Sequence, residues 1–335
     1  MRSMTSAQCQ QTAVDWYNKG LALYKSAWKR EGMNQACTKE DIYNCYRLLL
    51  GRDIAPVEWP LHQAEVGQPL KSVVSSYLGS VEFMTRGFGS SKITLTDLPD
   101  FKIYVDDFPP IGGAIQNNKT YEPHVTKIMK SILKQGMTFL DVGANIGYYS
   151  LLAAGMLGPS GKVISVEPNV QNVKLLYLSS IINEFDNIEI YPFAASNCRG
   201  LISYSHDMSN GSIFSANDPN VVFGADLVFS EKLDNLVDRV DVIKIDVEGA
   251  DYLALKGGRH LLESRPTIFA EFSPLALQSV SGVTGKDYLE LLIDAGYEIT
   301  VIMLDESVIE CEKDIDKIIK ICKDAKSGYI DIFAS

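Results

Sequence analysis

The chain has 335 residues, of which 46% are hydrophobic, so it can form one large domain and a smaller one with cores of ordinary size. A formal net charge of −11, with no block of lysine or arginine, disfavours a protein that holds nucleic acid against a broad basic face. Six cysteines occur without a C-x-x-C pair or a histidine at ligand spacing, which disfavours a zinc site and a disulfide framework and is typical of reduced thiols in the cytoplasm.

The beginning of the chain is predicted to be helical. It lacks the apolar core of a signal peptide, and the longest apolar stretch of the sequence, at 148–157, is too short to span a bilayer. We therefore expect no transmembrane segment and a cytoplasmic protein. Apolar side chains recur at helical spacing over residues 14–28, and Thr38 with Asp41 is the pattern of a capping box that opens a second helix ending near Gly51.

The composition of the chain changes near residue 90. A further helix is predicted over residues 70–78, and the sequence RGFGSSK at 86–92 is typical of a linker because it brings glycine and serine together. We therefore predict a small all-helical domain over residues 1–90 and a second domain over residues 91–335.

The second domain alternates strands with helices. It begins with two short strand patterns, at 92–95 and 101–105, that predict a hairpin, and a helix follows from about 120 to 134. Seven strands are then expected, mostly separated by helical segments, at 138–142, 162–166, 188–192, 240–245, 267–271, 297–303 and 329–333. This order predicts a doubly wound α/β sheet.

The sequence DVGANIG follows the first of these strands, where doubly wound sheets bind their ligands. Gly143 and Gly147 would allow the backbone to approach a ligand closely, and Asp141 places a carboxylate at the strand end. The spacing differs from the G-x-G-x-x-G of dinucleotide sites, and an acidic strand end suits an ammonium group better than a pyrophosphate.

A second acidic residue ends the next strand. Glu167, in VISVEP, lies 24 residues after Gly143, where a carboxylate can accept hydrogen bonds from both hydroxyls of a ribose. A glycine turn alone or a strand-end glutamate alone is a weak signal, since many folds contain one. Together, at this spacing, they predict a nucleoside site.

These motifs resemble the FkbM-type class I methyltransferases, which use S-adenosylmethionine. The resemblance covers roughly residues 121–335 and rests on YEP at 121–123, FLDVGANIGYYSLLAA at 139–154, GPSGKVISVEPN at 158–169, VIKIDVEGAD at 242–251 and IFAEFSP at 268–274. It implies a seven-stranded Rossmann-like methyltransferase sheet, S-adenosylmethionine as cofactor, and methylation of a hydroxyl on a sugar, glycan or sugar-bearing metabolite.

The resemblance also implies which residues bind the cofactor. The methionine part would be lined by Asp141, Gly143, Asn145 and Gly147. Glu167 would hold the ribose, and Glu122 would approach from the helix that precedes the first strand. The adenine pocket would be shaped by Pro168, Asn169 and the turn of Ala194, Ala195 and Ser196.

The chain departs from the family pattern N-x-x-x-N after the second strand. The segment LLYLSSIIN offers Ser179 or Ser180 and only Asn183, which leaves a contact from this helix open.

The N-terminal region has a resemblance of its own. YRLLLGRD at 46–53 and YLGSVEF at 77–83 are similar to a phycobilisome-linker-like helical domain that is often attached to glycan-modifying proteins. This implies an interaction or positioning module and a possible protein partner. We interpret Arg52 and Asp53 as a structural pair.

Methyl transfer to a sugar hydroxyl requires a general base or a divalent cation near the methyl group, since the hydroxyl is a poor nucleophile at neutral pH. The segment KIDVEGAD would project Asp246 and Glu248 toward the acceptor from the fourth strand. Asp246 is the leading candidate for the base or for a ligand of Mg²⁺, and the alternative is a cap of the next helix. Lys244 could offset its charge or bind the acceptor, or could only extend toward solvent.

Two more residues are candidates. Glu271 ends the fifth strand and could be a second base or ligand, or could anchor a loop. His206 lies in the long insertion between the third and fourth strands, where a lid over the acceptor is expected, and it could be a base or an exposed loop histidine. The other three histidines lie in helical contexts and carry no signal.

Several acceptors and functions are disfavoured. The fourth strand lacks the N/D-P-P-Y/F of adenine amino methylation, there is no Pro-Cys pair for attack on a pyrimidine, and no basic patch for RNA is present. By resemblance, a saccharide or small-molecule acceptor is left, with no nucleic acid partner. The alternatives are a nicotinamide-dependent oxidoreductase, which the glycine spacing disfavours, and a non-catalytic scaffold, which the carboxylates at one sheet edge disfavour.

Overall fold

The computed structural model describes residues 35–46, 54, 58–78, 93–106, 111–207, 210–214 and 226–335. The chain separates into two compact units, residues 1–93 with 180–186, and residues 94–179 with 187–335. The expected helix at 14–28, the helix end at Gly51, the pair of Arg52 and Asp53, and the linker at 86–92 lie outside the described residues.

The first unit contains the short helices of the N-terminal region. These are α2 (Lys39–Asn44), α3 (Trp59–His62), the 3-10 turn η2 (Gln63–Glu65) and α4 (Leu70–Leu78). The capping box at the start of α2 is confirmed, because the Thr38 hydroxyl accepts from the backbone of Asp41 and the Asp41 carboxylate accepts from the backbone of Thr38. The predicted bounds of α4 are also confirmed, whereas α3 was not predicted.

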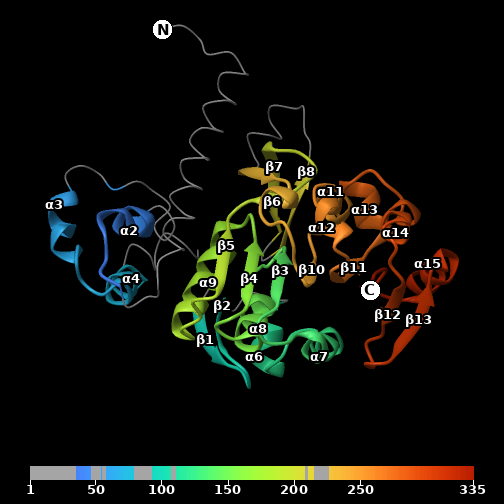
Figure 1. The fold of residues 1–335 in the computed structure, drawn as a ribbon, viewed down its shortest axis with the longest axis horizontal. Helices are drawn as coiled ribbons and strands as arrows, with labels where there is room; N and C mark the ends of the chain where they lie inside the picture. The colour runs from blue at the N-terminus through green and yellow to red at the C-terminus, as the bar shows by residue number, and fades with distance from the viewer. Residues whose placement is uncertain are drawn as a thin grey trace, which may run out of the picture. The chain divides into compact units, whose positions relative to one another are not determined.

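The second unit is built on an eight-stranded sheet in the order β13-β12-β14-β11-β10-β3-β4-β5 (Figure 1). Its strands are β3 (Thr138–Val142), β4 (Lys162–Val166), β5 (Ile188–Tyr191), β10 (Val242–Ile245), β11 (Thr267–Phe272), β12 (Ile299–Ile302), β13 (Val308–Glu312) and β14 (Ile330–Ala334). The strands from β5 to β11 are parallel, and β14 runs antiparallel to both of its neighbours.

The seven predicted strands are confirmed, and the prediction of seven is wrong by one. The eighth strand, β13, lies at the edge of the sheet and pairs only with β12 in the described part of the chain. Only Cys311 of this strand is buried, so its sequence lacks the apolar run that marks the buried strands.

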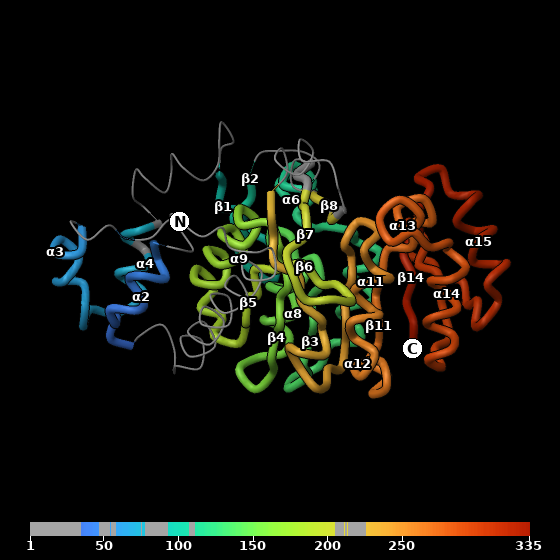
Figure 2. The backbone as a smooth tube through the Cα atoms, turned by 90° about the horizontal axis from the view of Figure 1, so that it is seen from above, coloured from blue at the N-terminus to red at the C-terminus, as the bar shows by residue number. Residues whose placement is uncertain are grey.

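Helices cover the sheet. They are α6 (Ile111–Asn118), α7 (Pro123–Ile132), α8 (Tyr148–Leu157), α9 (Val170–Ile182), α11 (Asp251–Lys256), α12 (Arg259–Glu263), α13 (Pro274–Val280), α14 (Gly285–Asp294) and α15 (Ile315–Asp324). Helix α8 contacts β3 and β4, and eight of its ten residues are buried. Figure 2 shows α14 and α15 at the end of the sheet opposite to β5. The apolar α8 therefore belongs to the core, and no helix of the described residues is long and apolar enough to cross a membrane.

Two smaller sheets accompany the central one. Strands β1 (Ile93–Asp97) and β2 (Lys102–Asp106) form the two-stranded sheet that the sequence predicts. A four-stranded sheet, ordered β6-β9-β7-β8, is made of β6 (Ala194–Ala195), β7 (Gly200–Asp207), β8 (Asn210–Phe214) and β9 (Asp226–Glu231). The described residues of the insertion in which a lid is expected thus contain three strands of this sheet, whose antiparallel pairing satisfies backbone groups that a loop leaves to solvent.

Candidate active site

A row of ionisable side chains lies at the carboxyl end of the central sheet. Lys244 of β10 pairs in register with Asp141 of β3 and with Phe269 of β11. Glu271, two residues after Phe269, pairs with Asp331 of β14. Paired residues, and residues two apart on a strand, share a face of a sheet, so these groups project from the same face.

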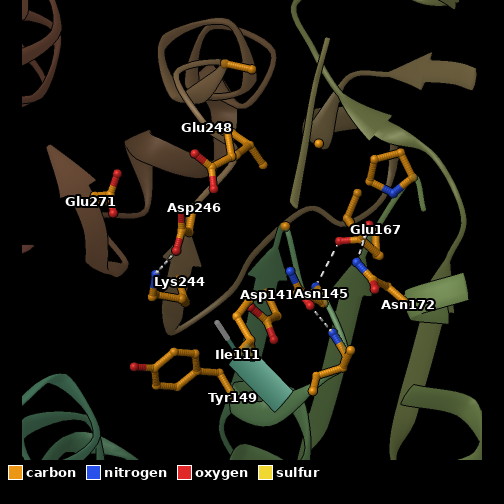
Figure 3. A pocket seen from close by; sticks show the side chains of 18 of the residues that line it. Ile111, Asp141, Asn145, Tyr149, Glu167, Asn172, Lys244, Asp246, Glu248 and Glu271 are labelled. Carbon is orange, nitrogen blue, oxygen red and sulfur yellow. Dashed lines mark hydrogen bonds and ion pairs between the residues drawn. The ribbon is translucent and has the colours of Figure 1, made fainter. Parts of the chain in front are cut away.

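A cavity of about 520 Å³ lies at this edge. Figure 3 shows Lys244, Asp246, Glu248 and Glu271 on one side of it, Glu167 and Asn172 on the other, and Asp141 with Asn145 between them. The volume is within the range of small-molecule sites. The motifs from four strand ends therefore line one cavity.

Asp141 is fixed beneath the cavity by buried hydroxyl groups. Its carboxylate accepts a hydrogen bond from the Ser150 hydroxyl at 2.5 Å, and Ser150 in turn contacts the Ser165 hydroxyl at 2.7 Å. Burial raises the pKa of Asp141 to about 6, against the Ser150 hydrogen bond and the charge of Lys244, which lower it. At neutral pH the group is a carboxylate suited to a cationic ligand.

The two glycines of the turn make room for protein atoms. Gly143 has φ of +80°, and a Cβ atom there would collide with the backbone carbonyl of Asp246. Gly147 has φ of +91°, and a Cβ atom there would collide with the Leu176 side chain of α9. Gly143 lines the cavity, whereas Gly147 is not among the described residues that line it. Gly147 therefore has a packing role, and its predicted contact with the cofactor stays a prediction.

Glu167 is held by the backbone of two neighbouring turns. Its Oε2 accepts from the Asn145 backbone N–H and its Oε1 from the Asn169 backbone N–H, both at 2.8 Å. Asn145 reaches this position with φ of +51°. Burial raises the pKa of Glu167 to about 7, and these backbone hydrogen bonds lower it. Each carboxylate oxygen has two lone pairs, so Glu167, which lines the cavity, retains acceptor capacity beyond these two hydrogen bonds.

The side of the cavity beyond Glu167 is lined by Pro168, Ala194 and Ala195, and their predicted contact with an adenine stays a prediction. Asn169 is buried and is not among the described lining residues, because its side chain accepts from the Gln171 backbone N–H at the start of α9. The lining residue of this helix is Asn172, which sequence reasoning missed. Asn172 follows Asn169 by three residues, a shorter spacing than N-x-x-x-N, and its amide lies 3.4 Å from Glu167.

Lys244 and Asp246 form an ion pair at 3.2 Å between Nζ and Oδ2. Burial lowers the pKa of Lys244. The charges of four carboxylates raise it by more, so that its pKa lies above the ordinary value of lysine; they are those of Asp246, Glu122, Asp331 and Asp141. Lys244 is 2% exposed, so it does not extend to solvent. Asp246 does not cap the next helix, α11, because the N-cap residue of that helix is Ala250. The structure therefore gives both side chains a place in the cavity wall.

Three predicted catalytic residues are left, and the structure describes the side chains of two of them, Glu248 and Glu271, but not that of His206. Glu248 lines the cavity with φ of +53°. Burial raises the pKa of Glu271 to about 9, with further increases from the charges of Asp246 and Glu248, so this carboxyl is neutral at pH 7. The backbone of His206 lies in β7 opposite Gly211, and its side chain lies outside what the structure describes.

Glu122 and two tyrosines complete the wall near Lys244. Glu122 directly precedes α7, with φ of +39°, and accepts from the Tyr149 hydroxyl at 2.6 Å. Burial raises its pKa. Lys244 Nζ lies 5.4 Å from the centre of the Tyr149 ring, which packs edge-on against Tyr121. Sequence reasoning placed Glu122 within a helix and missed both tyrosines, since aromatic residues at helical spacing are usually core residues.

The cavity is strongly acidic. Six carboxyl groups line it, those of Glu122, Asp141, Glu167, Asp246, Glu248 and Glu271, and Lys244 is the one basic residue among the described lining residues. Such a wall favours a cationic ligand, and S-adenosylmethionine carries a sulfonium and an ammonium group. Within the described residues, no group of three or more His, Cys, Asp or Glu side chains is arranged to hold a metal ion.

Comparisons with known proteins agree with this chemistry. Residues 141–299 match the methyltransferase FkbM domain, and residues 98–180 match the family of protein-L-isoaspartate(D-aspartate) O-methyltransferases. The protein-L-isoaspartate O-methyltransferase 2 of Archaeoglobus fulgidus is 34% identical over 91 residues, which are 26% of this chain and 39% of that protein. The protein-L-isoaspartate O-methyltransferase of Methanopyrus kandleri is 38% identical over 73 residues, or 21% and 30% of the two chains.

The matches thus span less than two fifths of these relatives. Among solved structures, the precorrin-6y C5,15-methyltransferase of Geobacter metallireducens is similar over 64% of this chain and 88% of its own, with 17% identity and a TM-score of 0.36.

The sheet, the cavity and the matched domains define the class as the S-adenosylmethionine-dependent methyltransferases with a Rossmann-like fold. Within this class, the domain model that residues 141–299 match is that of the FkbM methyltransferases.

Proposed function

We propose that the protein transfers a methyl group from S-adenosylmethionine to a hydroxyl oxygen of a saccharide or of a small molecule that carries one. The observation that carries the proposal is the pairing of Asp246 with the buried Lys244 at the wall of an acidic cavity that also contains Asp141 and Glu167. A cytoplasmic location and a protein partner for the N-terminal region stay predictions.

The cofactor would be held by residues of three strand ends. Asp141 and the turn of Gly143 and Asn145 suit its amino-acid part, and Glu167 suits the ribose. Pro168 and Asn172 would lie against the base. When bound, S-adenosylmethionine supplies an electrophilic methyl group on a sulfonium sulfur.

The chain's own contribution to the reaction is alignment and proton removal. An acceptor hydroxyl beside Asp246 would donate its hydrogen bond to this carboxylate, and its oxygen would attack the methyl carbon. The C–O bond forms as the C–S bond breaks, and the proton passes to Asp246. Lys244 holds one Asp246 oxygen and leaves the second for the acceptor.

The charge of the cavity supports an uncharged acceptor. Even with Glu271 neutral, five other carboxyl groups and one lysine line the wall, so an anionic acceptor would meet repulsion close to the reacting atoms. Glu271, neutral at pH 7, would donate a hydrogen bond to a second hydroxyl of a polyhydroxylated acceptor. These features favour a sugar ring over a carboxylate or a phosphate.

A second candidate is methylation of a protein carboxylate. It is favoured by the match of residues 98–180 to protein-L-isoaspartate(D-aspartate) O-methyltransferases. In that reaction the acceptor is itself an anion and needs no general base, so loss of the Asp246 carboxylate would not slow it. The two candidates therefore differ in their dependence on Asp246.

The experiment incubates the full chain with methyl-labelled S-adenosylmethionine and fractionated host extract, with and without EDTA. Label is then measured in saccharide, lipid, protein and RNA pools, with Asp246→Asn as the matched variant. The proposal predicts label in saccharides or small molecules and a large loss with Asp246→Asn. Loss of transfer with EDTA would indicate Mg²⁺ in place of a simple base. Label in protein or RNA alone would contradict the acceptor class.

A further inference from the structure

His124 and Asp331 form a buried pair behind the wall of the cavity. Nε2 of His124 lies 2.8 Å from Oδ2 of Asp331, and the two residues are 5% and 8% exposed. His124 belongs to α7 and Asp331 to β14, so the pair joins segments that are 207 residues apart in the sequence.

The pair lies directly beside residues of the proposed active site. Asp331 is opposite Glu271 in the register of β14 and β11, and paired residues share a face. His124 lies two residues after Glu122, and Asp331 two residues after Tyr329, and both of these neighbours line the cavity. The charge of Asp331 is close enough to Lys244 to raise its pKa.

Asp331 is therefore one of four carboxyl groups whose charge acts on Lys244, together with those of Asp246, Glu122 and Asp141. Asp246 holds Lys244 at 3.2 Å, and Asp331 attracts it from the same face of the sheet. A buried carboxylate without a counter-charge is costly, so Asp331 would draw Lys244 away if nothing else neutralised it. His124, whose Nε2 lies 2.8 Å from Asp331, supplies that neutralising charge when it is protonated.

We propose that His124 is a positioning residue: it neutralises Asp331 and so keeps the ammonium group of Lys244 on Asp246. This inference rests on the proposed function, in which Asp246 is the base. His124 itself touches neither acceptor nor cofactor in this arrangement. Its effect passes through Asp331 and Lys244 to the orientation of the base.

The surroundings of His124 are suited to keeping it protonated. The hydrogen bond that His124 donates to Asp331 raises the pKa of His124, burial lowers it, and the charges of Asp331, Glu122 and Glu306 raise it. Three ionisable residues from other elements surround Asp331. His124 of α7 lies within hydrogen-bonding distance of it, and the charge of Asp331 acts on Lys244 of β10 and on Glu271 of β11. Because the net direction for His124 is upward, its charge is lost only as pH rises above the ordinary range of histidine, and we expect transfer to decline there.

The test compares His124→Gln with the double variant His124→Gln/Asp331→Asn. Glutamine can donate to Asp331 but cannot neutralise it, so we expect kcat to fall roughly tenfold with no more than threefold change in affinity for S-adenosylhomocysteine. The double variant joins two neutral amides and leaves Lys244 to Asp246. It should recover kcat to within about threefold of wild type and lack the alkaline decline. His260→Gln, at a histidine whose side chain is 78% exposed, is the matched control.

A crystal structure of His124→Gln tests the inference without an activity assay. Lys244 should move from Asp246 toward Asp331. An unmoved Lys244, or a double variant that keeps the alkaline decline, would overturn the inference. If His124→Gln does not fold, the pH profile of the double variant decides alone. Absence of methyl transfer in the wild type would refute the proposed function, while the position of Lys244 in the variant would still test the positioning.

Discussion

Replacing Glu271 by glutamine should stabilise the protein at neutral pH. Burial raises the pKa of this carboxyl from the ordinary 4.5 to about 9, so the folded protein holds it neutral at pH 7 while the unfolded chain holds it ionised. Ionisation of the unfolded chain therefore favours unfolding. Glutamine is nearly isosteric with the protonated acid and removes this advantage of the unfolded state.

The size of the effect follows from the distance between pH 7 and 4.5. Each pH unit between the two pKa values is worth 1.36 kcal/mol, so at pH 7 the substitution should raise the free energy of unfolding by up to about 3 kcal/mol. For a domain of this size, that corresponds to roughly 5–10 °C in Tm. Because the folded pKa is raised, the penalty is absent below pH 4.5 and grows as pH rises toward 9.

Urea unfolding of the two proteins between pH 4.5 and 8.5 measures the difference directly. The gap in free energy of unfolding should widen with pH, while Glu298→Gln, at an exposed glutamate near β12, should match wild type throughout. Parallel stability curves for Glu271→Gln and wild type would refute a neutral Glu271. A variant less stable than wild type at pH 7 would show that the ionised carboxylate is the folded form.

Three further substitutions test the site. Asp246→Asn should slow methyl transfer by roughly two orders of magnitude, the range of a lost general base, and should leave the affinity for S-adenosylhomocysteine unchanged. If single-turnover kinetics gave the same rate for the variant as for wild type, Asp246 would have no part in the mechanism. Glu167→Ala should weaken cofactor binding by roughly 1–3 kcal/mol, since a charged acceptor is lost, and calorimetry giving wild-type affinity would place the ribose elsewhere. Gly143→Ala should destabilise the fold by about 2 kcal/mol or more, because φ is +80° and the new Cβ meets the Asp246 carbonyl, and an unchanged Tm would contradict that packing.

The strands that carry the cofactor site could be predicted from sequence because their signals are local. The bounds of β3 and β4 match the prediction residue for residue, since each is a short run of mostly buried residues closed by a glycine or acidic turn. Asp141 lies one residue before the end of β3 and Glu167 directly follows β4, so their place at the cavity followed from the strand pattern.

What the sequence could not provide is the pairing between distant segments. The register that sets Asp331 opposite Glu271 joins residues far apart in the chain, and no spacing in the sequence encodes it. His124 carried no signal for the same reason, because its partner lies 207 residues away. Asn172 was missed for a different reason, because it follows Asn169 by three residues and so does not fit the N-x-x-x-N spacing of the family.

Ionisation states depend on this distant pairing more than on residue type. Glu271 and Asp246 are both acidic and lie at the carboxyl ends of the neighbouring strands β11 and β10. Glu271 is neutral at pH 7 because burial and two neighbouring carboxylates oppose its charge, while Asp246 has Lys244 beside it. One residue can thus donate a hydrogen bond and the other can accept a proton. A sheet that gathers six carboxyl groups around one lysine separates acid from base by position, and a cationic cofactor would reduce the repulsion among them when it binds.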